Sequence, residues 1–219
     1  MSEIGPETDA LRAALERSRL AGSLGPGPVE AHIRHSEGFA EAAEAALGGE
    51  PATFADLGTG GGVPGLVLGL RWPRSRGVFV ESNQRRAAAL REALLGMGLG
   101  DRIEVLEQRA EVVGRPGEHR ELFEVVTARS FAEPAVTAEI AAGLVQVGGL
   151  LVVSEPPDPM TGQPRWPSEQ LSELGFEPAD QVEHAGAHFA VVRKVAPAPE
   201  RFPRSVGRPG KRPLWRCST

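Results

Sequence analysis

The sequence has one cysteine, no long apolar run and no apolar leader at its start. Cys217 stands alone, so no intramolecular disulfide can form. No stretch approaches the roughly 18 to 20 apolar residues that a helix needs to span a bilayer. Residues 1–7 are acidic and lack the basic start and apolar core of a signal peptide. These absences predict a cytoplasmic protein without a membrane partner.

Metal and catalytic clusters are missing as well. Five histidines are present, but they form no pattern with metal-ligand or catalytic-triad spacing. We therefore expect no metal, and the sequence identifies no catalytic residue. The chain has no internal repeat and no linker long enough to divide it, and nothing in it indicates an oligomer.

The net charge of −5 is unevenly distributed. Residues 193–216 carry eight basic residues and one acid, a charge of +7, which leaves −5 − 7 = −12 for the rest. A basic tail on an acidic body indicates a polyanionic partner that is met at one place. Arginine outnumbers lysine 22 to 2, which we interpret as a coding bias, so arginine frequency alone does not indicate RNA binding.

Hydrophobic periodicity predicts a short helical region followed by alternating strands and helices. Two N-terminal helices, 8–20 and 29–47, are separated by a Gly/Pro breaker. We expect strands at 53–57, 77–81, 103–106, 123–127 and 149–153, the last entered through a turn at 147–149. Helices are expected from the glycine-rich segment to Trp72, at 83–97 and at 168–174. A closing hairpin is expected from 176–183 and 188–195, and the prolines after Val195 predict little regular structure.

This order predicts an α/β fold with a mostly parallel sheet, helices on both faces and an antiparallel last strand. We expect one domain over residues 1–195, with a helical cap at 1–50 and an α/β core at 51–195. Residues 196–219 form a basic, proline-rich tail.

The segment 54–65, F-A-D-L-G-T-G-G-G-V-P-G, is the candidate ligand site. An apolar strand that ends in an acid and then a glycine-rich loop places backbone close to a ligand at the carboxyl edge of a sheet. Strand two ends in Glu81, where such folds place an acid that binds a ribose diol. A purely structural glycine turn is the alternative.

The loop fits a dinucleotide fingerprint poorly, because Val63 occupies the third glycine position and Pro64 removes an N–H donor. It instead contains D-x-G-x-G-x-G through Asp56, Gly58, Gly60 and Gly62. That pattern is used by S-adenosylmethionine-dependent methyltransferases, whose cofactor carries an ammonium and a sulfonium that favour a nearby acid.

Several further motifs resemble one family of bacterial enzymes. They are D-L-G-T-G-G-G-V-P-G (56–65), E-S-N-Q-R-R (81–86), R-A-E (109–111), T-A-R-S-F-A (127–132), G-G (148–149), H-I-x-x-S (32–36) and P-R-x-x-G-x-P-x-K-x-P-L (203–214). Over roughly residues 29 to 214 the chain is similar to the glucose-inhibited division protein B family. These methyltransferases modify nitrogen seven of a guanine in 16S ribosomal RNA. The resemblance implies a Rossmann-like class I methyltransferase sheet and 16S RNA or the small ribosomal subunit as partner.

The resemblance also implies site residues. The family's contacts with S-adenosylmethionine fall on Gly58, Val63, Ala110, Glu111 and Arg129, to which the residues themselves add Asp56, Gly60, Gly62 and Glu81. Contacts with RNA are expected from His32, Arg129, Arg204, Arg208, Lys211 and Arg212, with Phe202 and Trp215 available for stacking. The alternatives are packing for His32, an ordinary surface position for Arg129 and a solvated tail.

Two departures from the family pattern lie on the acceptor side. Residues 20–24 lack the family's tryptophan and asparagines, and Glu155 stands near the position of a usual lysine. Guanine nitrogen seven has a free lone pair, so the implied reaction needs positioning and no general base. A methyltransferase with another RNA or small-molecule acceptor, or a non-catalytic relative, is the alternative function.

Overall fold

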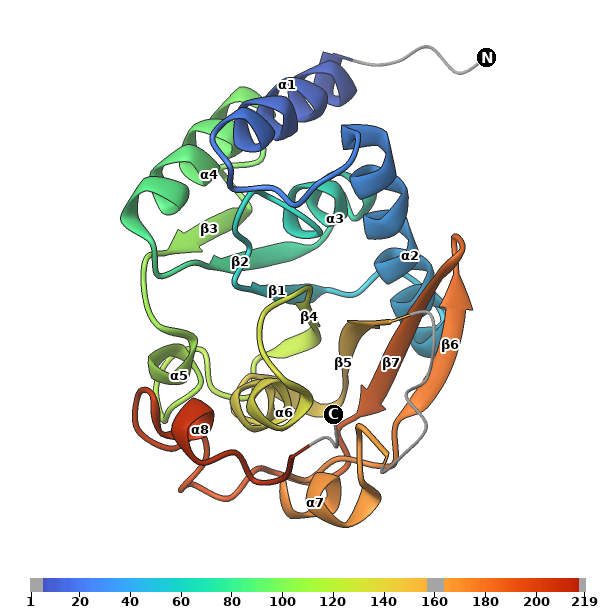
Figure 1. Ribbon diagram of the computed structural model, residues 1–219, viewed down its shortest axis with the longest axis vertical. Helices are drawn as coiled ribbons and strands as arrows, with labels where there is room; N and C mark the ends of the chain where they lie inside the picture. The colour runs from blue at the N-terminus through green and yellow to red at the C-terminus, as the bar shows by residue number, and fades with distance from the viewer. Residues whose placement is uncertain (1–5, 157–163, 217–219) are drawn as a thin grey trace.

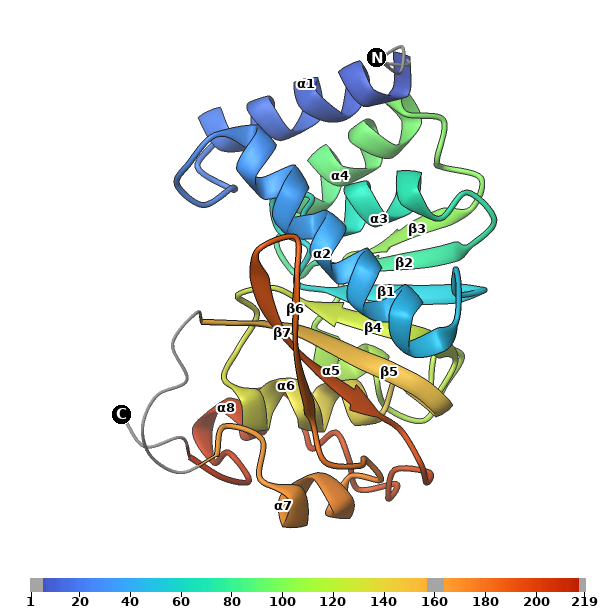
Figure 2. The same ribbon diagram turned by 90° about the vertical axis from the view of Figure 1, so that its right-hand side faces the viewer.

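The computed structural model describes residues 6–156 and 164–216 (Figure 1). Cys217 and the first five residues, which entered the sequence-based predictions, lie outside this range. The described chain forms one seven-stranded sheet between two groups of helices. Figure 2 shows α1 to α4 over one face of the sheet and α5 to α8 over the other.

The predicted helices and strands are present, and helices at 110–113, 134–142 and 208–211 add to them. The helices are α1 (Pro6–Leu20), α2 (Val29–Leu47), α3 (Gly65–Arg71), α4 (Gln84–Gly96), α5 (Ala110–Val113), α6 (Pro134–Ala142), α7 (Ser168–Glu173) and α8 (Arg208–Lys211). The strands are β1 (Thr53–Leu57), β2 (Arg76–Val80), β3 (Ile103–Leu106), β4 (Phe123–Ala128), β5 (Val145–Glu155), β6 (Asp180–His184) and β7 (Ala187–Arg193).

The strand order is β3-β2-β1-β4-β5-β7-β6. The first five strands of this order pair in parallel, and β7 pairs antiparallel with both β5 and β6. The predicted fold class, a mostly parallel sheet with an antiparallel last strand, is confirmed. Because β1 and β4 are neighbours, the strand order reverses between β1 and β4, where open parallel sheets hold their ligands.

Alternate side chains of each strand enter two separate cores. Phe54 and Phe79 join Trp72 and Phe39 beneath α1 to α4, and the Phe54 and Trp72 rings meet edge to face at 5.2 Å. The other face is filled mainly by small and branched residues under α5 to α7. Each fully buried large side chain contributes roughly 1.5–3 kcal/mol, so both helical layers are firmly bound to the sheet.

Local signals at the helix ends explain why several predicted bounds agree with the structure. Gly48 ends α2 in the left-handed conformation, with φ of 84°, and its N–H donates to the Glu44 carbonyl. Asn83 begins α4 by accepting the Arg86 N–H with its side chain.

Two strand predictions need correction. The segment expected as strand from residue 176 is regular only from Asp180, because Phe176 turns into the core and forms an isolated bridge with Lys194. The predicted turn at 147–149 lies inside β5. The strand is irregular at this point rather than interrupted. Gly148 has a φ of 90°, and the pairing of β5 with β4 shifts register between Phe123 and Val125.

The tail is folded onto the α6 face of the molecule. Phe202 and Trp215 are buried in the second core, so the expectation that they stack on RNA bases is wrong. Their apolar surface is already removed from water by packing. Arg204 contacts Glu139 of α6 through both carboxylate oxygens. One short helix, α8, interrupts the otherwise irregular tail (Figure 1).

Candidate active site

The glycine-rich loop connects β1 to α3 at the carboxyl edge of the sheet. Gly58, Gly60 and Gly62 have φ values of 64°, 56° and 106°, in the region that side-chain-bearing residues avoid. Their spacing therefore reflects the backbone conformation that turns the chain from strand to helix.

Asp56 braces this loop from inside the protein. Its carboxylate accepts the Gly65 N–H at 3.1 Å and the Thr127 hydroxyl at 2.8 Å. The side chain is completely buried, and burial raises the pKa of Asp56 to about 7 despite these hydrogen bonds. Asp56 was predicted to contact the cofactor, but its buried side chain lines none of the three cavities described here and instead supports the loop.

Glu81 links the loop to the start of α4. One carboxylate oxygen accepts the Gly60 N–H at 3.0 Å and the other accepts the Asn83 N–H at 2.7 Å. The side chain also lines a cavity of about 790 Å³, here called the first cavity. Since an ionised carboxylate has about four acceptor sites, Glu81 retains capacity for two hydroxyl donors.

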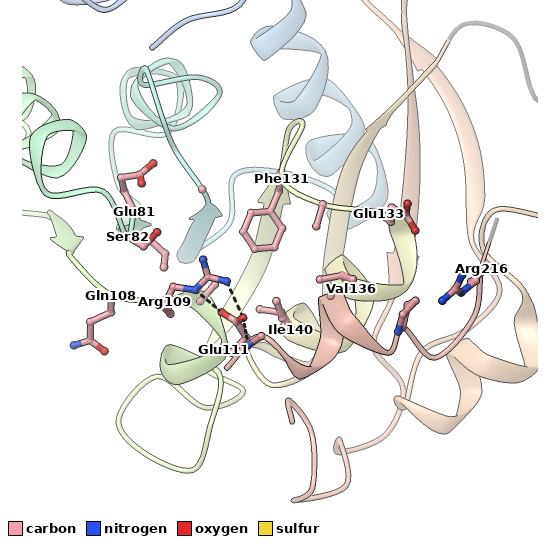
Figure 3. Close-up of a pocket in the computed structure, with 17 residues that line it drawn as sticks. Glu81, Ser82, Gln108, Arg109, Glu111, Phe131, Glu133, Val136, Ile140 and Arg216 are labelled. Atoms are coloured by element: carbon pink, nitrogen blue, oxygen red, sulfur yellow. Dashed lines mark hydrogen bonds and ion pairs between the residues drawn. The ribbon is translucent and has the colours of Figure 1, made fainter. Parts of the chain in front are cut away.

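The first cavity lies where β1, β2, β3 and β4 end, and Figure 3 shows the side chains that surround it. Gly58, Ala110 and Glu111, all predicted for the cofactor, lie in its wall. Gln108, Arg109 and Phe131 also line this cavity but were not among the predicted site residues. Arg109 and Phe131 belong to the family motifs at 109–111 and 127–132, which was the signal that could have identified them, and Gln108 follows β3.

Glu111 is held by two neighbours rather than directed at open space. Arg109 donates two hydrogen bonds to it, at 2.9 and 3.2 Å, and the Gly207 N–H donates a third at 3.1 Å (Figure 3). Burial opposes ionisation, but the Arg109 and Gly207 hydrogen bonds leave the pKa of Glu111 below its usual value. Glu111 thus fixes the tail, and Gly207, Gly210, Pro213 and Arg216 complete the cavity wall.

Three predicted loop residues do not line the first cavity. Gly60 faces a different cavity, of about 450 Å³, between α1 and α4. Val63 packs into the first core and Gly62 packs against Leu66. These three residues lie on the side of the loop that faces away from the first cavity.

Arg129 lies in a second cavity, of about 350 Å³, beyond the end of β4. The second cavity shares Phe131 and Ala132 with the first. Arg129 Nη2 forms a hydrogen bond of 2.7 Å with His32 Nδ1. The other ring nitrogen of His32, Nε2, lies 3.1 Å from the Gly25 carbonyl oxygen. His32 is buried, so its predicted direct contact with RNA is replaced by support of Arg129.

Glu155 also lines the second cavity. Arg165 Nε donates to its carboxylate at 2.6 Å, and the Glu155 side chain is only 5% exposed. The acid that replaces the family's usual lysine is therefore compensated by a cation from a later segment.

The predicted basic residues of the tail separate into two groups. Arg204 is occupied by buried Glu139, with Nε at 2.8 Å from the carboxylate. Arg208, Lys211 and Arg212 have exposed side chains and, within the described part of the chain, no ion pair.

Within residues 6–156 and 164–216, no helix is long and apolar enough to cross a membrane. The same residues contain no group of three acidic, histidine or cysteine side chains that could hold a metal ion.

Solved structures of other proteins share this fold. A methyltransferase from Geobacter sulfurreducens superposes with a TM-score of 0.58 at 14% identity and covers 89% of this chain and 91% of its own. An O-methyltransferase from Bacillus cereus in complex with SAH superposes with a TM-score of 0.57 at 15% identity, covering 85% and 91%. The fold is that of the Rossmann-like class I methyltransferases.

Sequence comparison identifies the family. The family model described as "rRNA small subunit methyltransferase G" matches residues 31–155. The relative of that name from Chloroflexus aggregans is 37% identical over 75% of this chain and 70% of its own, and that from Roseiflexus castenholzii is 36% identical over 76% and 73%. The chain belongs to this family and is an S-adenosylmethionine-dependent methyltransferase, as its motifs predicted.

Proposed function

We propose that this protein transfers a methyl group from S-adenosylmethionine to N7 of a guanine in 16S ribosomal RNA. The observation that carries the proposal is the meeting of two cavities at Phe131 and Ala132. One cavity is large enough for a nucleoside cofactor, and the other opens at the ends of β4 and β5. The names of the relatives support ribosomal RNA as acceptor.

The first cavity has the chemistry that this cofactor requires. Glu81 would accept the ribose hydroxyls, and Gly58 would allow backbone to approach without a Cβ. Ala110 would lie at the base, beside the Glu111–Arg109 pair. Carboxylates in the wall, including exposed Glu133, suit a ligand with an ammonium and a sulfonium.

When bound, the cofactor would supply an electrophilic methyl group. The N7 lone pair would form the new C–N bond as the C–S bond breaks, so the purine gains the positive charge that sulfur loses. No proton moves, and the protein's task is to hold N7, carbon and sulfur in line. The rigid loop braced by Asp56 and Glu81 would provide that alignment.

The exposed tail cations would bind RNA backbone. Arg208, Lys211 and Arg212 lie beside residues that line the first cavity, where phosphates near the target nucleotide would pass. Such contacts give affinity that falls with salt. A ribosomal acceptor also favours the cytoplasm as the working compartment.

The test is transfer of labelled methyl to small ribosomal subunits from a strain that lacks this enzyme. Label at N7 of one guanine in 16S RNA is expected, and Gly58→Arg should abolish both transfer and cofactor binding while the protein remains folded. Cofactor binding without any RNA labelling would refute the proposal and favour another acceptor or a non-catalytic role.

A further inference from the structure

Two side chains that line the second cavity each have one buried polar atom without a partner in the described structure. These atoms are Nε2 of His35 and Nη1 of Arg129. Buried donors and acceptors are almost always hydrogen-bonded, because an unmade bond costs roughly 1–3 kcal/mol. Two such atoms on side chains that line one cavity therefore indicate a ligand with complementary polar groups.

Arg129 is held in a fixed orientation. The Gly25 carbonyl accepts a hydrogen bond from His32 Nε2, which leaves Nδ1 as the acceptor for Arg129 Nη2. Burial and the nearby Arg129 charge lower the pKa of His32, so its ring remains neutral and keeps this acceptor. Because Nη2 is bound to His32, Nη1 is the part of the guanidinium that has no partner among the described residues.

His35 is a neutral group at physiological pH. Burial, with smaller contributions from Arg129 and His32, lowers its pKa to about 4. Its ring is fixed by Phe39 and Phe189, at centroid distances of 5.6 and 5.5 Å. The cavity therefore offers one cation and one neutral ring nitrogen from its α2 and β4 sides.

Glu155 supplies an acceptor to the same cavity. Its Oε2 receives the short bond from Arg165 Nε, whereas its Oε1 lies 3.5 Å from Arg165 Nη2. At 3.5 Å the second contact is weak, so Oε1 retains capacity for stronger donors. A cavity with a guanidinium donor and a carboxylate acceptor discriminates between bases.

Among the bases of RNA, guanine presents the O6 acceptor next to the N1–H and 2-amino donors. Adenine presents an amino donor where guanine has O6, and an acceptor where guanine has N1–H. On the premise of the function proposed above, we propose that the second cavity receives the target guanine, with Arg129 Nη1 donating to O6 and Glu155 Oε1 accepting from N1–H and the 2-amino group. His35 contributes a third polar contact.

This arrangement is consistent with reaction at N7. In guanine N7 lies on the same edge as O6, so a base whose O6 is bound by Arg129 has its N7 on the Arg129 side of the second cavity, whose wall includes Phe131 and Ala132 of the first cavity. Glu155 also suits the product, because methylation leaves a positive charge on the purine.

The test uses the variant Glu155→Gln, with Glu183→Gln on exposed β6 as the matched control. Small subunits would carry either guanine or adenine at the position that the wild-type enzyme labels. We expect kcat/KM for guanine to fall about ten- to a hundredfold, as for loss of a base-specific bidentate contact. The preference for guanine over adenine should narrow, and cofactor Kd by calorimetry should stay within about twofold of wild type.

A wild-type kcat/KM in Glu155→Gln would overturn the base pocket and leave the proposed function intact. Equal losses for both bases, or a loss of cofactor affinity in parallel, would also overturn it, because these results indicate a general structural role. Absence of RNA labelling by the wild-type enzyme would instead refute the proposed function, and the base pocket with it. Arg129→Gln provides a second variant, for which the same narrowing of preference is expected.

Discussion

Replacing Gly58 by alanine tests the geometry of the cofactor site. The residue has φ of 64°, and an added Cβ would lie 2.7 Å from Phe131 Cδ2 and 3.4 Å from Cε2. Real Cβ atoms do not approach other atoms so closely, so the ring must move. Phe131 forms part of both cavities, and its displacement changes the space that cofactor and acceptor occupy.

The magnitude follows from two effects. A left-handed conformation costs a non-glycine residue roughly 1–2 kcal/mol, which lowers the free energy of unfolding. Displacement of the Phe131 ring from its packed position adds about 1–3 kcal/mol, typical of overpacking. If the ring moves into the first cavity, a similar free energy is lost from binding, and each 1.4 kcal/mol weakens affinity about tenfold.

The assay is calorimetric titration of S-adenosylmethionine or its demethylated product into each variant, with denaturant unfolding measured in parallel. Gly186→Ala is the control, because Gly186 has φ of 73° but its Cβ would meet nothing within 4 Å. Both variants should lose similar backbone stability, and only Gly58→Ala should lose affinity. Phe131→Ala added to Gly58→Ala should relieve the clash. Equal cofactor affinities for wild type, Gly58→Ala and Gly186→Ala would refute the reasoning.

Three other changes test separate parts of the structure. Arg204→Ala leaves the buried carboxylate of Glu139 unpaired, which should lower the free energy of unfolding in urea by about 3–5 kcal/mol. The double variant Arg204→Ala/Glu139→Gln should recover part of this loss. An unchanged urea midpoint for Arg204→Ala would contradict the pairing. Asp56→Asn should exceed wild-type stability at pH 8 by on the order of 4 kcal/mol. The reason is that the folded-state pKa of about 7 keeps native Asp56 protonated while the unfolded chain ionises from about pH 4, so wild-type stability falls as the pH rises from about 4 to 7. The two proteins should converge near pH 4, and a difference independent of pH would be inconsistent with this cause. Arg208→Ala and Lys211→Ala should each weaken binding to small subunits and reduce the salt slope by about one, whereas an unchanged slope would exclude them from the RNA interface.

The sequence by itself determined the class of fold and the location of the cofactor site. Strand-ending acids and a glycine-rich loop are local features, because the backbone conformation at Gly58 and the position of Glu81 after β2 follow from nearby residues. The family motifs supplied the enzyme class in the same way. The helix α6 was not predicted, because it is buried on nearly every side and has no polar face to mark its period.

Only the tertiary structure decided which predicted residues face a cavity. Asp56 and Glu81 both end apolar runs in the sequence, yet one is enclosed by the sheet and the other borders the first cavity. Arg204 and Lys211 belong to one basic tail, yet buried Glu139 neutralises only the former. Such distinctions depend on groups far away in the chain, because burial and ion pairing are set by packing between elements rather than by neighbours in sequence.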